Sequence, residues 1–310
     1  MLHTDSIEVT VVIKSLLRVI KRKTAAFLFQ EYYNDLSAQI QNLNRNLNFV
    51  VNNSFDISKI VPMPSAKALH VHLYEIMERL VTVFDANGIE YFLFCGTLLG
   101  AVRHHGFIPW DDDIDIAIIR EDFHKVLGLE KELEEAGLKL SSPFSLQINY
   151  SGRGFTKVYD TKTGLHVSLF VVDLINPTDL EGLLKRRTKY YQFARALRSG
   201  YRKESSRKEK DAFRIRCIEL EDRYLEGLDV RTKATADAGT YITTSVFSAR
   251  QNAYMHHETV FPLSRASFLV CDNQKRIEYS VPNSPEEFLQ NFYGPDYMFF
   301  PGDLYPKHKE

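Results

Sequence analysis

Between Phe94 and Ile116 the chain reads FCGTLLGAVRHHGFIPWDDDIDI. The first half of this stretch predicts a short apolar strand that runs into Gly96 and Thr97 at the start of a helix. Glycine there allows close backbone approach, and the Thr97 hydroxyl and the free N–H groups of a helix start can hold a phosphate oxygen. Because any strand-to-helix turn can use Gly-Thr, this half alone does not identify a function.

The second half places two carboxylates at the start of a strand. The period of two directs Asp113 and Asp115 to one face, while Ile114 and Ile116 pack on the other. Two neighbouring carboxylates repel unless a cation neutralises them, and ligands that are all oxygen favour Mg²⁺ or Mn²⁺. The alternative is that residues 111–113 form a solvated acidic loop, which the apolar run after Asp115 disfavours. Together the two halves predict metal-assisted phosphoryl transfer.

This stretch resembles the LicD family, whose members include bacterial phosphocholine transferases and the fukutin-type phosphoribitol transferases, built on the nucleotidyltransferase fold. The motif of that family is reproduced by GTLLGAVRHHGFIPWDDDIDI at residues 96–116, and the resemblance extends over roughly residues 68–308. Shorter echoes of the family occur at residues 155–160, 261–263 and 293–298, with Pro301.

The resemblance implies transfer of a phospho-alcohol, phosphocholine or similar, from a CDP-linked donor to a sugar hydroxyl, with CMP leaving. Gly96 and Thr97 would then hold donor phosphate, and Asp113 and Asp115 would bind the magnesium or manganese ion and act in catalysis. The acceptor would be a glycan or lipid-linked glycan of the cell surface, such as a lipopolysaccharide, teichoic acid or capsule.

Three further residues are substrate-binding candidates by the same resemblance. Arg103 and Lys157 match family positions and would contact phosphate, although an arginine near the end of a helix can instead complement the helix dipole. Trp110 could stack on a choline ammonium group by cation–π attraction, but it also occurs in relatives that handle ribitol and so does not identify the alcohol.

The sequence departs from the family at Ser168, where a third carboxylate is usual. A serine hydroxyl is a poor magnesium ligand and a weak base. The enzyme can work with two carboxylates and water, it can recruit His166 or a nearby acid such as Asp173, or it has lost catalysis and kept binding. His166 lies two residues before Ser168 on the same strand face, which makes it the better geometric substitute, although a structural histidine is the alternative.

Length and composition frame these predictions. The 310 residues are 44% hydrophobic with a formal net charge of −1, which excludes disordered and collagen-like classes and gives no global field for nucleic acid. The three cysteines lie far apart and indicate no disulfide framework. We expect an N-terminal helical appendage at residues 1–63. A domain at residues 64–310 should follow, with a basic helical insertion around residues 179–230.

The fold class that the pattern predicts is α/β (α+β), a nucleotidyltransferase-like mixed sheet flanked by helices with helical additions. No internal repeat or heptad array is expected. The expected helices are residues 69–84, 97–105 and 121–136, with another that begins with a capping box at Ser284 and ends at Gly294. The expected strands are residues 91–95, 113–119, 146–150, 154–159 and 165–172, with a hairpin at 268–272 and 276–281.

Three functional alternatives remain open at this point. The leading one is the magnesium-dependent transferase, the second is a catalytically weakened or silent relative that acts as a nucleotide- or glycan-binding partner, and the third is a nucleotidyltransferase that releases pyrophosphate. A cytoplasmic location is expected, because no signal peptide or apolar run of eighteen residues is evident. A basic amphipathic pattern at residues 9–29 leaves a peripheral contact with the inner face of the cell membrane as an alternative to packing on the domain.

Overall fold

The structure is a computed structural model, and it describes residues 30, 32–43, 45–47, 56–140, 156–183, 185–186, 216, 219, 223, 225–244, 254–270 and 276–299. The chain divides into two compact units, one of residues 1–56 with 300–305 and one of residues 57–299 with 306–310. The expected strand at 146–150, the amphipathic pattern at 9–29 and most of the basic insertion lie outside the described residues.

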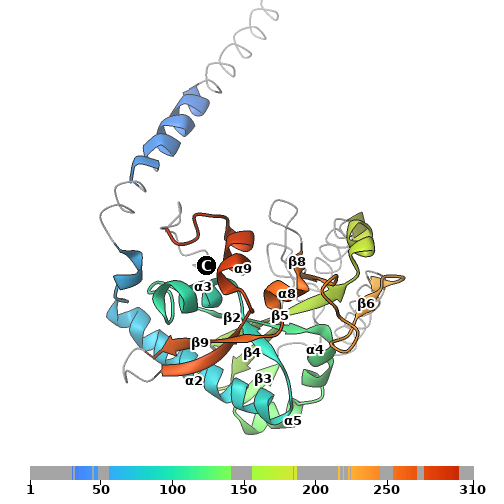
Figure 1. The fold of residues 1–310 in the computed structure, drawn as a ribbon. Coiled ribbons are helices and arrows are strands. Elements are labelled where there is room, and N and C mark those ends of the chain that lie inside the picture. Colours follow the sequence, from blue (N-terminus) through green and yellow to red (C-terminus); the bar gives the residue numbers. More distant parts are fainter. Residues whose placement is uncertain are drawn as a thin grey trace, which may run out of the picture. The chain divides into compact units, whose positions relative to one another are not determined.

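A mixed sheet forms the centre of the larger unit (Figure 1). Its strands lie in the order β1-β2-β5-β4-β3, in which only β2 and β5 are parallel and the other neighbours are antiparallel. The bounds are β1 Tyr91–Leu93, β2 Ile114–Ile119, β3 Leu138–Leu140, β4 Thr156–Asp160 and β5 His166–Ile175. The far half of β5 also pairs with β6 (Val230–Arg231) and β7 (Tyr241–Thr244), and β7 pairs with β8 (Met255–His256). The predicted mixed sheet flanked by helices is confirmed.

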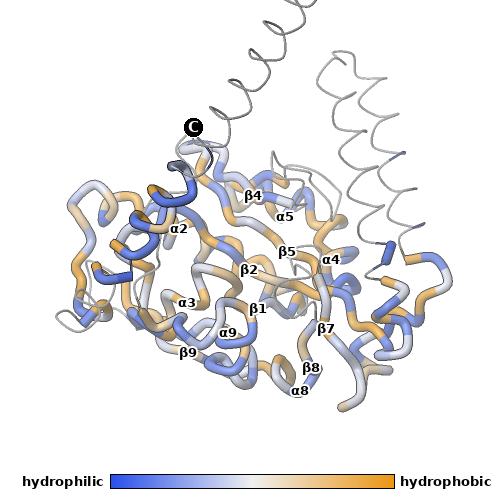
Figure 2. The backbone as a smooth tube through the Cα atoms, turned by 90° about the horizontal axis from the view of Figure 1, so that it is seen from above, coloured by the Kyte–Doolittle hydropathy of each residue, from blue (hydrophilic) through white to orange (hydrophobic). Residues whose placement is uncertain are grey.

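The strands β2 and β5 run through the core of the sheet, where Figure 2 shows strongly apolar tube. Every residue of β5 after His166 is buried, as is every residue of β2 except Asp115. This explains the continuous apolar runs of the sequence, because strands that are buried on both faces of a sheet have no solvent-exposed face on which polar residues would alternate. The register sets Asp115 opposite Ser168, and Ser168 opposite Lys157 on β4.

Helices pack against the central sheet. The long helix α2 (Pro64–Ala86) begins with proline at its first turn and ends before Gly88, whose φ of 64° suits glycine. The helix α3 (Cys95–His104) follows β1 directly, and α9 (Pro285–Tyr293) packs beside it through aromatic contacts. The ring centroids of Phe94 and Phe288, for example, lie 5.8 Å apart. The helix expected at 69–84 is confirmed, with one further turn at its start.

Two local expectations were wrong. The helix expected at 121–136 is two short helices, α4 (Arg120–Val126) and α5 (Glu130–Glu135), because Leu129 leaves helical geometry (φ −96°, ψ 25°) beside Gly128. The capping box at Ser284 is absent, since the Ser284 side chain makes no cap bond. The Glu287 carboxylate instead accepts a hydrogen bond from Thr259, 3.2 Å away, which ties α9 to α8 (His257–Val260).

The remaining elements complete the unit. An antiparallel hairpin, separate from the main sheet, is formed by β9 (Ser264–Leu269) and β10 (Arg276–Val281). The second strand is where it was expected, but the first begins four residues earlier than the predicted 268–272. Short 3₁₀ turns occur at η1 (Ile57–Lys59) and η2 (Pro177–Asp179), and Ile57 is buried, so the compact unit starts six residues before Met63. Among the described residues, no helix is both long and apolar enough to cross a bilayer.

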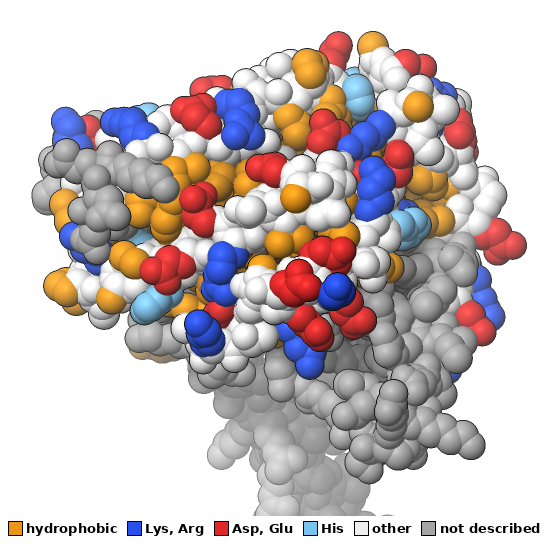
Figure 3. All heavy atoms as spheres, turned by 90° about the horizontal axis from the view of Figure 1, so that it is seen from below, with side chains coloured by type: hydrophobic (Ala, Val, Ile, Leu, Met, Phe, Trp, Pro, Cys, Tyr) orange, Lys and Arg blue, Asp and Glu red, His pale blue; other side chains and the backbone are white. Residues whose placement is uncertain are grey.

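The surface seen from below mixes charges of both signs. Figure 3 shows lysine and arginine side chains interspersed with aspartate and glutamate over this face, with short apolar stretches between them. A face of this kind has no strong field of one sign.

Candidate active site

Two hydrogen bonds join the start of α3 to the start of β2, one between backbone groups and one from the backbone to a side chain. The N–H of Phe94 donates to the carbonyl of Asp115 at 3.0 Å, and the N–H of Asp115 donates to the hydroxyl oxygen of Thr97 at 2.8 Å. Thr97 is buried, with 4% of its surface exposed. The threonine that was predicted to hold phosphate therefore positions Asp115, and its hydroxyl proton remains available for an acceptor.

Gly96 lies directly against the carboxyl group of Asp111. A Cβ atom at position 96 would be 2.7 Å from Oδ2 of Asp111, closer than real Cβ atoms come to a neighbour. The prediction that this glycine allows close approach is confirmed, but the group that approaches in the structure is a carboxylate of the protein. The same close approach brings the acidic loop to the N-terminus of α3, where the helix dipole favours negative charge.

The acidic loop is held in place from two sides. A ring nitrogen of His70, on α2, lies 2.8 Å from the carbonyl oxygen of Asp111, and the His70 ring stacks on Phe107 with centroids 4.7 Å apart. The N–H of Leu269 on β9 donates to the carbonyl of His105 at 2.6 Å. The loop between α3 and β2 is therefore fixed at its base and its tip, and its carboxylates are preorganised.

The carboxylates of this loop form a cluster. Oxygen atoms of Asp111, Asp112 and Asp113 all lie within 4.8 Å of one another, with Asp112 exposed and the other two half-buried. Burial, followed by the charges of Asp113 and Asp112, raises the pKa of Asp111 to about 8. Burial and the charges of Asp113 and Asp111 likewise raise the pKa of Asp115 well above its usual value. Burial and the mutual repulsion of these acids therefore both disfavour their charged forms.

A divalent cation fits this donor set. Several half-buried carboxylate oxygens that repel one another, with no other ligand type among them, are the arrangement that Mg²⁺ or Mn²⁺ stabilises. The predicted metal ligands were Asp113 and Asp115. The structure adds Asp111, and the group of oxygens within reach of one ion contains Asp113 but not Asp115. The hypothesis of a solvated acidic loop does not describe Asp111.

Across the sheet from the acids lie Ser168, Lys157 and His166. The buried Ser168 hydroxyl donates a hydrogen bond to the Asp115 carboxylate, and this bond and the charge of Lys157 partly offset the rise in the pKa of Asp115. Nζ of Lys157 lies 2.7 Å from Nε2 of His166. Burial lowers the pKa of Lys157, while Asp113 and Asp115 act against that change. All three predicted residues thus reach the same cluster.

Asp173, the nearby acid considered as a substitute for the missing carboxylate, is used elsewhere. It lies an odd number of residues from Ser168 and so points to the opposite face of β5. There its two oxygens accept hydrogen bonds from Arg120 at 2.5 and 3.2 Å. Of the two residues considered as substitutes for the missing third carboxylate, only His166 therefore lies on the strand face of Ser168.

Arg103 and Trp110 lie on the other side of the cluster. The buried Arg103 donates from Nη1 to the carbonyls of Tyr297 and Phe299 at 2.8 and 3.2 Å, so it holds the segment after α9 in place. Burial lowers its pKa to about 10, with Tyr293 and Asp111 acting in the other direction. Trp110 is 36% exposed, which leaves part of its indole face open at the rim.

Tyr293, at the end of α9, was noted in the sequence only as part of a family echo. Its ring is 41% exposed, but its hydroxyl is close enough to the acids to feel their charge. Burial of the hydroxyl, together with Cys95 and the carboxylates of the cluster, raises its pKa well above the usual value. Because Tyr293 comes from a helix nearly 180 residues later in the chain, spacing could not have assigned it to this site.

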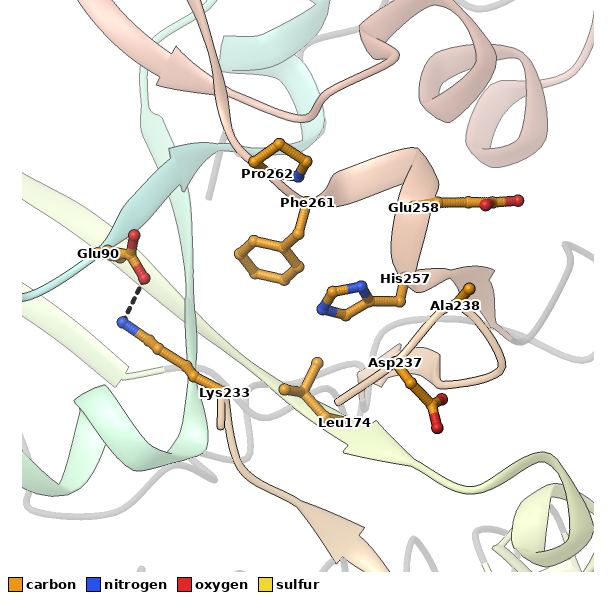
Figure 4. A pocket seen from close by; sticks show the side chains of 9 residues that line it. All are labelled: Glu90, Leu174, Lys233, Asp237, Ala238, His257, Glu258, Phe261 and Pro262. Atoms are coloured by element: carbon orange, nitrogen blue, oxygen red, sulfur yellow. Dashed lines mark ion pairs between the residues drawn. The ribbon is translucent and has the colours of Figure 1, made fainter. Parts of the chain in front are cut away.

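A separate pocket of about 450 Å³ lies elsewhere on the unit. In Figure 4 the side chains of Leu174, His257 and Phe261 surround it, Lys233 pairs with Glu90 at its edge, and the Glu258 carboxylate points away. Leu174 is six residues beyond Ser168 on β5, which places it roughly 20 Å along the strand from the acids. No predicted site residue lines this pocket.

Comparison with known proteins finds similarity in the part of the chain that contains the acidic cluster. Residues 88–198 match a family model described as LicD/FKTN/FKRP, nucleotidyltransferase domain. The LicD lipopolysaccharide cholinephosphotransferase of Haemophilus influenzae is 31% identical over 88 residues, which are 28% of this chain and 33% of that protein. Human ribitol 5-phosphate transferase FKRP is 35% identical over 98 residues, 32% of this chain and 20% of FKRP.

A third relative has no assigned activity. The protein RP689 of Rickettsia prowazekii, described as uncharacterized, is 42% identical over 69 residues, 22% of this chain and 26% of its own length. The chain spans about a fifth to a third of the length of the curated relatives that it matches. Each relative matches only part of this chain, and the part that the family model matches contains the acidic cluster, Lys157 and Ser168. Residues 88–198 of this chain are therefore similar to the LicD family.

Proposed function

We propose that the chain transfers a phospho-alcohol from a CDP-linked donor to a sugar hydroxyl in glycan synthesis. The observation that carries this is the cluster of Asp111, Asp112 and Asp113, whose charges also reach Asp115, inside the segment that matches the LicD/FKTN/FKRP family model. A divalent cation bound by these acids would neutralise the donor's phosphate oxygens and stabilise the leaving CMP. Magnesium is the expected ion because every donor is a carboxylate oxygen.

The residues of the chain would act on the donor as follows. The N-terminal N–H groups of α3 at Gly96 and Thr97 would hold a phosphate oxygen, and the Lys157 ammonium would contact another. The acceptor hydroxyl would attack the distal phosphorus, forming a new P–O bond while the bond from that phosphorus to the bridging oxygen breaks. The electron pair leaves with CMP, and the hydroxyl proton passes to a base.

The base is the step in which this chain differs from its family. Ser168 donates its hydrogen bond to Asp115 and is not free to accept the proton. The imidazole of His166 shares the strand face of Ser168, and its Nε2 lies 2.7 Å from Nζ of Lys157. Nε2 would accept the proton once the Lys157 ammonium turns from it to the donor phosphate. We therefore propose His166 as the base that replaces the third carboxylate.

A second candidate function is favoured by Ser168 itself. With this residue in place of an acid, the chain would bind the donor with magnesium but turn it over slowly or not at all, and would serve as a nucleotide- or glycan-binding partner. Calorimetry with CDP-choline separates the candidates. Binding without product under every acceptor, with activity gained in Ser168→Asp, supports the silent relative.

The decisive experiment is a donor screen by mass spectrometry. The protein is mixed with magnesium, a glycan extract and CDP-choline, CDP-ribitol or CDP-glycerol, and CMP release and glycan mass are followed. Asp113→Asn should remove transfer while the fold is kept, and Asp85→Asn, an exposed acid at the end of α2, is the matched control. Pyrophosphate release from a nucleoside triphosphate, with no CMP from any CDP-alcohol, would contradict the proposal.

The location of the protein stays a proposal as well. Lipid-linked glycan acceptors would bring the chain to the cytoplasmic face of a membrane, where residues 9–29 would make a peripheral contact. Flotation with anionic vesicles, comparing the full chain with a form that begins at Pro64, tests this. Equal flotation of both forms would contradict a membrane role for these residues.

A further inference from the structure

The helix that contains residues 32–43 and 45–47 exposes a line of large apolar side chains. The exposed fractions are 58% for Tyr33, 42% for Leu36, 50% for Ile40, 66% for Leu43 and 58% for Leu47. We call these five residues the heptad seam. Because removing apolar side chains from water is favourable, the seam favours a partner.

The spacing of the seam identifies the kind of partner. Its members follow one another at intervals of 3, 4, 3 and 4 residues, which assigns Tyr33, Ile40 and Leu47 to the a positions of a heptad, and the two leucines between them to d. The same spacing continues in the sequence to Phe29 and Val50. Three heptads extend over about 33 Å of helix.

The rest of the helix surface argues against a bilayer or a globular partner. Between residues 32 and 47 the only charged residues are Asp35 and Arg45, which cancel, whereas a helix that binds a membrane surface carries an excess of lysine and arginine. An apolar stripe confined to a and d, with Tyr32 as the one large apolar residue beside it, is narrower than the face that packs on a globular core.

The positions that flank the seam favour a second copy of the same helix. Ser37 and Asn44 at e, and Gln39 and Asn46 at g, carry no charge. Two identical helices therefore meet without repulsion between like charges, and no charge pattern selects a different partner. Leucine at both d positions, with isoleucine at the central a position, favours two parallel strands.

Pairing would also explain why this segment is helical. Side-chain bonds from Gln30 to Asn34 (3.0 Å) and from Gln39 to Asp35 (2.9 Å) support the outer face. Such bonds contribute little stability, and a helix of this length is marginal alone in water. We propose that this helix forms a parallel two-stranded coiled coil with the same helix of a second copy of the chain.

Sedimentation equilibrium of the full chain tests the proposal. The wild type should have twice the 35.9 kDa of one chain, and Leu36→Ser with Leu43→Ser should return it to one chain. Asn34→Ser with Ala38→Ser, on the outer face, is the matched control and should stay dimeric. Circular dichroism checks that the larger unit remains folded. A monomeric wild type, or a double-leucine variant that stays dimeric, would overturn the proposal.

Register is tested by cysteine cross-linking. In a parallel pair, Leu43→Cys places two thiols within disulfide reach, so covalent dimers should form at least about tenfold faster than in Ala38→Cys or in the wild type with its three native cysteines. Equal rates in a dimeric chain would overturn this seam as the contact. Flotation of a monomeric wild type with neutral vesicles, lost in the double-leucine variant, would assign the seam to a bilayer instead.

Discussion

Asp115 and Ser168 face each other across the only parallel strand pair of the described sheet, and the serine hydroxyl donates to the aspartate carboxylate. An aspartate at position 168 would put a second carboxylate in direct contact with Asp115. The serine therefore lowers the negative charge of the cluster by one. This single difference sets how strongly the site demands a cation.

Ser168→Asp tests that relationship through stability. Without a divalent cation, the added buried charge should reduce the free energy of unfolding by about 2 kcal/mol. Magnesium should restore it, so the melting temperature of the variant should rise with magnesium more than that of the wild type, by scanning calorimetry. Ser65→Asp, on the exposed first turn of α2, is the control and should show neither change. A variant that melts like the wild type without cation would contradict the contact.

Gly96→Ala should separate the site from the fold. The new Cβ would lie 2.7 Å from Oδ2 of Asp111 and would therefore displace that carboxylate. Alanine is also the better helix former, by about 1 kcal/mol. We expect donor turnover to fall at least about tenfold with little change in melting temperature. Gly182→Ala, where a Cβ would meet nothing within 4 Å, is the control. Unchanged turnover in Gly96→Ala would show that Asp111 is not needed.

Arg103→Lys tests whether Arg103 holds the segment after α9 in place or contacts the donor phosphate. Lysine cannot reproduce the two bonds to the Tyr297 and Phe299 carbonyls, so the free energy of unfolding should fall by about 1–3 kcal/mol. Urea unfolding with and without donor measures it. An unchanged midpoint with a raised KM for the donor would instead assign Arg103 to phosphate.

The sequence predicted the part of the site that local chemistry determines. Glycine at a helix start and aspartates at alternate positions of an apolar strand leave few arrangements, so the turn, the strand β2 and the shared face of Asp113 and Asp115 followed. Asp111 was missed as part of the cluster because a run of three aspartates is more often solvated. The structure shows that the Asp111 side chain instead lies against Gly96 at the start of α3.

What the sequence could not predict depends on contacts between distant segments. Tyr293 reaches the acids from α9, and the hydrogen bond of Ser168 to Asp115 depends on the register of two strands more than 40 residues apart. The break between α4 and α5 was missed for a different reason. Its apolar spacing is helical throughout, and a single Gly128 is a weak signal against that pattern.

The acid limit of stability should depend on Asp160, at the end of β4. Burial alone would raise its pKa, but hydrogen bonds from Thr163 and Arg79, the latter at 2.6 Å, outweigh burial and lower the pKa to about 2. A carboxyl whose pKa is depressed by folding stabilises the fold above its unfolded pKa of 3.8 and loses that contribution as the pH falls toward 2. Asp160→Asn should therefore cost about 1–2 kcal/mol at pH 7 and flatten the stability profile between pH 4 and 2. Urea unfolding across that range measures it, with Glu135→Gln, from the exposed pair with Lys131, as the control. If Asp160→Asn kept the wild-type slope in that range, another carboxyl would have to carry the acid transition.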